Sequence, residues 1–347
     1  MQEPKYQKLA DALRAAVCGG VYPAGERLPS ENELVARTGY SRQTVRQAMA
    51  LLESEGLTVR VRGSGTYVRS GPAQRELTRN IAVVTTYIGE YIFPNILQGI
   101  QGVLAQNGYT PLLSATGNRL SEERRILSEL LDKPIDGLIV EGTKTALPNP
   151  NVDLYRRFAL RGIPAVFING YYPDVDDPVY VVADDRRGGR LACEQLLRRG
   201  HRRIAGVFKN DDMQGHRRYA GYAEALVEAG LPVDDDAILW YATENREALF
   251  DARLPGALRG CTAVVCYNDE AAMSLLARLR DGQAPEIVSF DHSLLAQMSP
   301  FLSLAGPKER LGALAAQKLL NILQGRVEHP AVLPWEMPPE CAKDMGK

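Results

Sequence analysis

Apolar residues follow two different periods along the first 69 positions of the chain. Apolar residues every three or four positions predict helices over 4–18, 30–38 and 41–55. The run 57–62 alternates at every second position, as a half-buried strand does, and 66–68 returns as its hairpin partner after a glycine-rich turn. Two short helices joined by a tight turn and followed by a β-hairpin predict a winged helix-turn-helix over residues 1–69.

The third predicted helix has two chemically different faces. Its apolar positions fall on one side and its polar N-terminal positions on the other; they are Val45, Ala48, Met49 and Leu52 against Arg42, Gln43 and Arg46. Guanidinium and amide groups at the start of such a helix match the base edges in the major groove of DNA. A merely solvated helix face is the alternative, but the surrounding winged-helix pattern favours DNA recognition. Arg60 and Arg62 in the hairpin would add charge near the phosphates.

Three stretches of this segment, 28–34, 41–46 and 62–68, closely resemble the GntR family of bacterial regulators. The resemblance covers residues 1–69 and implies double-stranded operator DNA as a partner. It implies DNA contacts at Glu31 or Asn32, Arg42, Gln43, Arg46, Arg62 and Gly63, and Thr44 and Arg60 complete the predicted DNA-binding set. Charge agrees with this, because ten Lys+Arg against seven Asp+Glu give residues 1–69 a net +3, whereas 31 against 35 give the rest −4.

From residue 80 the pattern changes to short apolar runs that alternate with helical stretches. The polar segment 70–79, which contains Gly71-Pro72, is interpreted as a linker. Strands are predicted at 81–86, 109–115, 135–141, 164–169 and 179–183, then at 204–208, 238–241, 263–267 and 287–290. Helices are expected between most of them, for example at 94–107, 121–131, 187–199 and 216–229. This alternation predicts parallel sheets covered on both faces, and the two series predict a two-lobed α/β domain over 80–347.

Polar residues gather directly after the predicted strands. Ligands of parallel sheets bind beyond the carboxyl ends of the strands, and between two lobes that edge is a cleft. Carboxylates, amides and an arginine there can hydrogen-bond sugar hydroxyls, while an aromatic ring covers the C–H face of the sugar. Helix capping is the alternative for any single residue of the set. The predicted ligand-binding residues are Tyr87, Tyr91, Phe93, Glu141, Lys144, Asn169, Asp184, Lys209, Gln214, Arg218, Asn268, Asp291 and His292.

Residues 80 to about 340 resemble the periplasmic-binding-protein-like (type I) effector domain of the LacI/GalR repressors. The stretches 218–221, 268–272 and 289–291 carry this resemblance, which implies that Asn169, Arg218, Asn268 and Asp291 contact a sugar. The combination with a GntR-type head is similar to the arabinose repressors of Gram-positive bacteria, with matching stretches at 85–94, 135–141 and 209–215. This resemblance implies a repressor of sugar-utilisation genes that L-arabinose releases from DNA. His292 departs from the family pattern, and both a pocket position and a surface cap stay open for it.

The sequence offers little for other functions. No dinucleotide fingerprint follows the strand at 81–86, and the chain has no phosphate-binding loop or nucleophile elbow, which argues against an enzyme. The five cysteines, at 18, 193, 261, 266 and 341, lack metal-ligand spacing, so we expect no metal and no cofactor. Another pentose, a sugar phosphate or a purine is the alternative effector, although the acids Glu141, Asp184 and Asp291 favour a neutral ligand.

Two further expectations concern location and assembly. The chain has no run of about eighteen apolar residues and no signal segment, which predicts a cytoplasmic protein without membrane contact. One winged helix reads one half-site, so we expect a homodimer on an inverted repeat.

Overall fold

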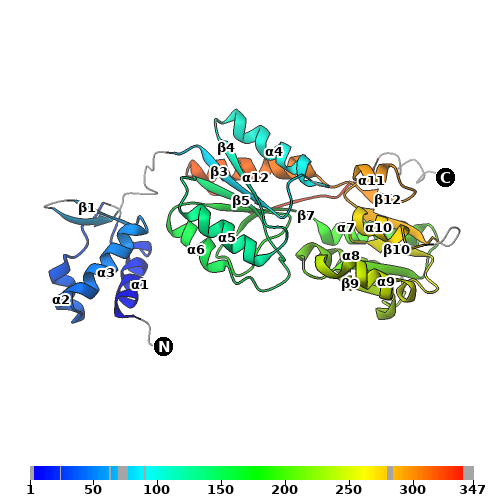
Figure 1. The fold of residues 1–347 in the computed structure, drawn as a ribbon, viewed down its shortest axis with the longest axis horizontal. Coiled ribbons are helices and arrows are strands. Elements are labelled where there is room, and N and C mark those ends of the chain that lie inside the picture. The colour runs from blue at the N-terminus through cyan, green and yellow to red at the C-terminus, as the bar shows by residue number, and fades with distance from the viewer. Residues whose placement is uncertain are drawn as a thin grey trace. The chain divides into compact units, whose positions relative to one another are not determined.

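The computed structural model describes residues 4–23, 25–61, 64–68, 77–89, 91–279 and 284–338 (Figure 1). The chain divides into two compact units, one of Met1–Thr78 with Asp153–Pro164 and one of Arg79–Val152 with Ala165–Lys347. Most of the predicted linker, residues 70–76, lies outside the described residues. None of the described helices is long and apolar enough to cross a membrane.

The first unit contains the predicted winged helix-turn-helix. Its elements are α1 (Lys5–Cys18), α2 (Glu31–Thr38), α3 (Arg42–Ser54) and the antiparallel pair β1 (Thr58–Val61) and β2 (Gly65–Val68). Ser30 and Glu33 form a reciprocal capping box that begins α2, and the Ser41 side chain caps α3 by accepting from the backbone N–H of Thr44. The four apolar residues predicted on the inner face of α3 are buried in the core of this unit. The predicted winged-helix fold is thereby confirmed.

The first lobe of the second unit is built on a six-stranded sheet. Its strands are β3 (Asn80–Thr85), β4 (Thr110–Ala115), β5 (Gly137–Glu141), β6 (Ala165–Ile168), β7 (Val179–Ala183) and β13 (Ala331–Leu333), in the order β13-β7-β6-β5-β3-β4. Its helices include α4 (Phe93–Gln106) and α5 (Leu120–Leu131), whereas α6 (Val152–Leu160), between β5 and β6 in sequence, falls almost entirely in the segment Asp153–Pro164 that is grouped with the first unit. In Figure 1, α12 (Lys308–Leu323, orange) runs beside α4 (cyan), and both contribute to the core of this lobe. A Cβ on Gly99 would lie 2.0 Å from the carbonyl oxygen of Glu309, so this close approach requires glycine.

The second lobe is built on a five-stranded sheet. Its strands are β8 (Ile204–Lys209), β9 (Ile238–Tyr241), β10 (Ala263–Cys266), β11 (Glu286–Phe290) and β12 (Leu302–Leu304), in the order β12-β11-β10-β8-β9. Its helices are α7 (Asp185–Arg198), α8 (Met213–Glu228), α9 (Arg246–Ala257), α10 (Asp269–Leu276) and α11 (Leu294–Gln297), with short 3₁₀ turns η1 (Asp235–Ala237) and η2 (Thr243–Asn245). The described strands pair in parallel in both lobes, which confirms the predicted α/β class.

The chain passes between the two lobes three times. It leaves the first lobe after β7, returns to it between β12 and α12, and leaves it again after β13. The three crossing segments, 183–185, 304–308 and 333–336, are here called the hinge. The third segment lies between the other two: the N–H of Asp184 donates to the carbonyl of Leu333 at 2.8 Å, and Ala305 and Glu336 pair as an antiparallel bridge. The lobes are therefore held together by hydrogen-bonded backbone at one edge.

Candidate functional site

Several of the predicted DNA-binding residues lie close together in the first unit. Glu31 at the start of α2 lies 3.6 Å from the guanidinium of Arg46 on α3 and 3.5 Å from that of Arg60 on β1. Beside this pair of contacts, Arg42 donates to the side-chain oxygen of Asn32 at 2.8 Å. Arg42, Arg46 and Arg60 are exposed. Because these ion pairs are exposed and weak, the guanidinium groups can exchange them for contacts to a polyanion.

The remaining predicted DNA-binding residues differ in their setting. Gln43 is exposed and lines, with Arg46 and Arg60, a shallow hollow between α3 and the hairpin. Thr44 is half-buried, and its hydroxyl lies 2.9 Å from that of Ser41 at the beginning of α3. Arg62 and Gly63 lie outside the described residues.

A cavity of about 300 Å³ lies in the second unit, at the carboxyl ends of its strands. Residues at or directly after β3, β5 and β6 of the first lobe line it, together with residues at or after β8, β9, β10 and β11 of the second. Ten of the thirteen predicted ligand-binding residues are among its lining: Tyr87, Tyr91, Phe93, Glu141, Asn169, Lys209, Gln214, Arg218, Asn268 and Asp291.

The structure places the other three predicted residues outside the described lining of this cavity. The ammonium group of Lys144 pairs with Glu244. Asp184 caps α7 by accepting from the backbone N–H of Arg187 at 3.0 Å, so the capping alternative describes its contact. His292 donates its backbone N–H to the hydroxyl of Ser303 at 2.8 Å. Successive residues of a turn point in different directions, which explains why Asp291 lines the cavity and its neighbour does not.

Arg218 is the largest buried cation of the site, with 2% of its surface exposed. Its Nε donates to Asp185 at 2.8 Å and its Nη1 to the backbone carbonyl of Tyr267. Burial raises the pKa of Asp185 to about 6, against the opposing effect of the Arg218 charge. Sequence reasoning chose Asp184 at this point, but Asp185 is the residue that holds the arginine.

Asp291 faces Arg218 from the end of β11. Tyr91 donates its hydroxyl to Oδ2 of Asp291 and accepts the backbone N–H of Asp269 at 3.1 Å. Burial raises the pKa of Asp291, and the nearby charge of Arg218 acts in the opposite direction. Asn268 begins α10, and its side-chain oxygen caps the helix at the N–H of Ala271. Asp291 and Asn268 form a polar wall of the cavity in the second lobe. Tyr91 lies between β3 and α4 of the first lobe, so its hydrogen bonds to Asp291 and Asp269 join the two lobes.

Glu141 and Asn169 form the facing wall in the first lobe. One carboxylate oxygen of Glu141 accepts both the N–H and the hydroxyl of Thr86, at 2.8 and 2.6 Å. The other accepts Nδ2 of Asn169 at 2.7 Å. Burial raises the pKa of Glu141, while these hydrogen bonds lower it. Glu141 is thus satisfied by protein groups and orients the amide of Asn169.

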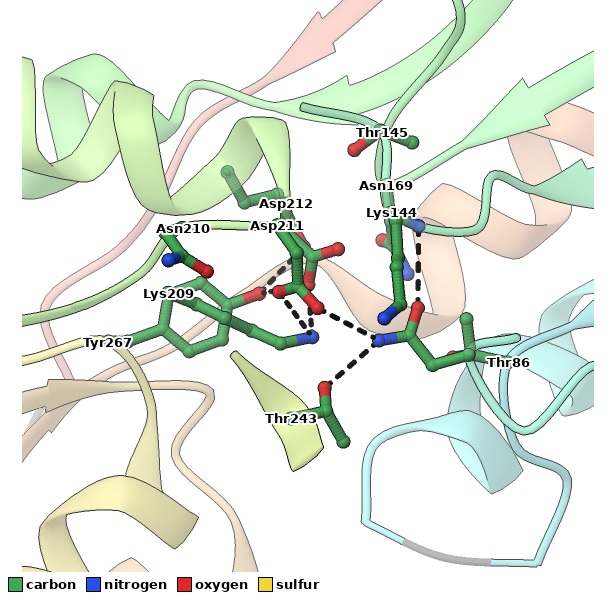
Figure 2. A network of polar contacts seen from close by, with 12 residues as sticks. Thr86, Lys144, Thr145, Asn169, Lys209, Asn210, Asp211, Asp212, Thr243 and Tyr267 are labelled. Atoms are coloured by element: carbon green, nitrogen blue, oxygen red, sulfur yellow. Dashed lines mark hydrogen bonds and ion pairs between the residues drawn. The ribbon is translucent and has the colours of Figure 1, made fainter. Parts of the chain in front are cut away.

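Lys209 sits among acids at the end of β8 (Figure 2). Its ammonium group lies 2.5 Å from Asp212 and 3.5 Å from Asp211. Burial lowers the pKa of Lys209, but the two carboxylates outweigh burial and raise it overall. Tyr267 donates its hydroxyl to Asp212 at 3.2 Å. Lys209 therefore keeps its positive charge, and the two neighbouring carboxylates balance that charge.

Further hydrogen bonds join the two lobes through residues that line the cavity. Asn118 donates to the hydroxyl of Thr243 at 2.9 Å, and the hydroxyl of Thr145 accepts the backbone N–H of Met213 at 3.0 Å. These residues, with Asp212 and Tyr267, were absent from the predicted set. Asp212 and Tyr267 follow predicted strands and carried a usable signal, whereas Asn118 and Thr145 lie further along their loops and carried none.

Strained backbone concentrates around the cavity. Eight described residues other than glycine have positive φ angles, and four of them, Tyr91, Asn118, Asn169 and Asp291, line the cavity. Two more, Lys144 and His292, are adjacent in sequence to the cavity residues Thr145 and Asp291. Side chains rarely adopt this conformation, and the cost is tolerated mostly where function requires a fixed geometry.

Comparisons with known proteins agree with this geometry. Residues 5–68 match the model of the bacterial regulatory proteins of the gntR family, and residues 78–333 match that of the periplasmic binding proteins and sugar binding domain of the LacI family. Two relatives are arabinose metabolism transcriptional repressors. The one from Geobacillus stearothermophilus is 39% identical over 93% of this chain and 92% of its own, and the one from Halalkalibacterium halodurans is 35% identical over 93% and 90%.

A solved structure, the transcription regulator CcpA of Lactococcus lactis, shares the fold of the second unit. Its TM-score is 0.65, with 23% identity over 75% of this chain and 97% of that one.

Proposed function

The chain belongs to the bacterial transcriptional repressors that join a GntR-type DNA-binding domain to a sugar-binding domain of the LacI family, and from this premise we propose that L-arabinose is its effector. In this proposal a homodimer in the cytoplasm binds an inverted-repeat operator of sugar-utilisation genes through α3 and the hairpin. L-arabinose binds in the cavity of the second unit and releases the operator. No reaction and no cofactor is assigned to the cavity.

The polarity of the cavity atoms carries the proposal. Hydrogen bonds among the described residues use Nδ2 of Asn169, which leaves its Oδ1 to accept, and Oδ1 of Asn268, which leaves its Nδ2 to donate. In the same way Arg218 keeps Nη2 as a donor and Asp291 keeps Oδ1 as an acceptor. Sugar hydroxyls both donate and accept, so two donors and two acceptors around one cavity suit a polyol. Aromatic rings of Tyr87 and Phe93, 5.9 Å apart, offer an apolar face.

Charge favours a neutral sugar over a phosphorylated one. Three cations are among the described residues that line the cavity, and each lies beside carboxylates: Lys209 with Asp211 and Asp212, Arg218 with Asp185, and Arg246 with Glu247 and Glu270. A phosphate group would compete with these acids and would lie close to Glu141 and Asp291. The names of the two relatives favour arabinose among neutral sugars.

A thermal-shift panel tests the effector directly. The full-length protein is melted with neutral pentoses, neutral hexoses, arabinose 5-phosphate and hypoxanthine, each at the same concentration. Binding to the folded state raises the melting temperature by linkage, so L-arabinose should give the largest increase. If the phosphate ester or the purine raised the melting temperature and L-arabinose did not, the proposal that L-arabinose is the effector would be wrong.

A further inference from the structure

Trp335 stands in the central segment of the hinge. The segment 333–336 is hydrogen-bonded to both other hinge segments, through Asp184 on one side and Ala305 on the other. Trp335 itself is buried, with 6% of its surface exposed, and belongs to the core of the second lobe. Any rotation of one lobe against the other therefore turns the backbone on either side of this side chain.

Two glycines show how closely the indole is enclosed. A Cβ on Gly188, three residues into the helix that follows the first hinge segment, would lie 2.6 Å from Cδ1 of Trp335. A Cβ on Gly306, within the second hinge segment, would lie 2.9 Å from Cζ3. The indole thus packs against the helix that follows the first hinge segment and against the second hinge segment, while the third segment supplies its backbone. It cannot keep its position if these segments move apart.

The indole also lies against the guanidinium of Arg218. The guanidinium carbon of Arg218 lies 4.8 Å from the Trp335 ring centre, 4.4 Å from that of Phe290 and 4.8 Å from that of Tyr267. Phe290 is itself packed edge-on against the indole at 5.1 Å. Phe290 and Tyr267 come from β11 and the end of β10, so Trp335 is the ring in this box that belongs to the hinge.

The indole N–H gives an independent sign that this packing leaves a polar group unsatisfied. Among the described residues, Nε1 of Trp335 is a buried donor without a hydrogen-bond partner. A buried unsatisfied donor is destabilising, and such groups in native proteins call for an explanation. A rotated hinge that gave this N–H an acceptor would remove that destabilising effect.

We infer that Trp335 is a positioning residue through which the hinge sets the guanidinium of Arg218 for sugar binding. The inference rests on the proposed sugar site and adds the residue that links that site to movement of the lobes. When the lobes rotate, the hinge segments carry the indole, and the indole displaces or frees the guanidinium beneath it. Conversely, a sugar that fixes Arg218 favours one hinge arrangement.

The first experiment uses Trp335 as its own reporter. The chain has two tryptophans, so Trp240→Phe leaves Trp335 as the single one. L-arabinose is titrated into this variant while emission and binding heat are recorded. We expect a change in Trp335 emission that saturates at the calorimetric Kd. Normal binding heat without an emission change would overturn the inference. If L-arabinose gave no binding heat at all, the proposal that it is the effector would be wrong, and the inference about Trp335 would fail with it.

The second experiment changes the indole and uses Trp240 as the matched control. Trp240 lies on β9 in the same lobe and packs against Phe208 and Tyr219. Trp335→Leu removes an aromatic ring from beside the buried guanidinium of Arg218, so it should raise the Kd of L-arabinose by about 3- to 30-fold. Trp335→Phe should recover most of that loss, and Trp240→Leu should leave the Kd unchanged. Equal Kd values for Trp335→Leu and Trp240→Leu, in proteins that melt as the parent does, would contradict the positioning role.

Discussion

At the scale of single residues, the pair of Asp185 and Arg218 is the most deeply buried ion pair beside the cavity that we propose binds the sugar. Both side chains are almost completely buried, and one hydrogen bond of 2.8 Å joins them. Breaking a buried pair leaves an uncompensated charge, which costs several kcal/mol, whereas the intact pair contributes much less. The pair is therefore better explained by the orientation it gives to Arg218 than by stability.

The raised pKa of Asp185 makes its contribution to stability depend on pH. The folded state has a pKa of about 6 for this group against an ordinary 3.8, so it holds more protons than the unfolded state between these values. The free energy of unfolding of the parent relative to Asp185→Asn should then fall by about 3 kcal/mol in total as pH rises from about 3 to 7, most of it between pH 4 and 6, and stay level above 7. Urea unfolding of both proteins across this range measures it. A difference that increases with pH would contradict the assignment.

Loss of either sugar-facing charge should give a repressor that no longer responds. Arg218→Ala and Asp291→Ala each leave a buried partner unpaired, at about 1–3 kcal/mol, so sugar affinity should fall by about 5- to 150-fold while operator affinity stays. DNA binding with and without L-arabinose, followed by fluorescence anisotropy, measures both quantities. Arg186→Ala is the control, because Arg186 is exposed on α7 and pairs with Glu224. Normal release of DNA by both cavity variants would move the site elsewhere.

Sequence reasoning at this scale identified residue types more reliably than their directions. It chose Asp184, Lys144 and His292, which the structure pairs or caps outside the described lining of the cavity. A strand-to-helix turn carries several polar residues in a row, and only the backbone dihedral angles decide which one turns inward. The positive φ angle of Asp291 is one such backbone feature, and no pattern of residue types predicts it.

At the scale of elements, α3 should carry sequence recognition. Arg46 lies on its exposed face, and a bidentate contact from an arginine to guanine distinguishes bases by about 1–3 kcal/mol. Arg46→Ala should therefore reduce the ratio of operator affinity to random-DNA affinity by about 5- to 150-fold. Anisotropy titrations at one fixed salt concentration measure the ratio.

Lys8→Ala provides the comparison for Arg46→Ala. It removes one positive charge from the exposed side of α1 and should weaken both kinds of DNA equally, if at all. An unchanged ratio in Arg46→Ala would mean that another element reads the operator.

The contact between α4 and α12 offers a test of packing within one helix. Gly99→Ala would place a Cβ 2.0 Å from the carbonyl oxygen of Glu309, so the helices must separate and the free energy of unfolding should fall by about 1–3 kcal/mol. Gly102, one turn further along α4, has open space around its Cβ position. Gly102→Ala should instead raise the free energy of unfolding by about 0.5–1 kcal/mol. Denaturant melts of both variants check this, and equal effects would refute the proposed packing.

The element pattern of the second unit was predictable except where the chain changes lobe. Nine strands and several helices were expected from apolar runs of four to seven residues. The strands β12 and β13 are three residues each, too short to stand out from loops. That β13 and α12 return to the first lobe depends on contacts between residues far apart in sequence, which periodicity cannot show.

At the scale of the whole molecule, the predicted DNA-binding residues and the cavity proposed for the sugar lie in different compact units. The predicted linker between them contains Gly71-Pro72 and no helical pattern, so it is expected to transmit spacing by its limited reach. In the proposed dimer each recognition helix must fit its own groove. A change in lobe angle that alters the spacing of the two helices would then penalise their simultaneous binding.

The most direct test of the account is reciprocity between sugar and operator. Calorimetry measures the Kd of L-arabinose for the free protein and for the protein saturated with operator, at one fixed salt concentration. If the sugar weakens operator affinity by some factor, the operator must weaken sugar affinity by the same factor, typically about 5- to 150-fold. We predict that the Kd of L-arabinose is higher for the operator complex than for the free protein. The ratio should equal the factor by which L-arabinose raises the operator Kd in anisotropy titrations. Equal Kd values in the two titrations would contradict the account, however tightly the sugar bound.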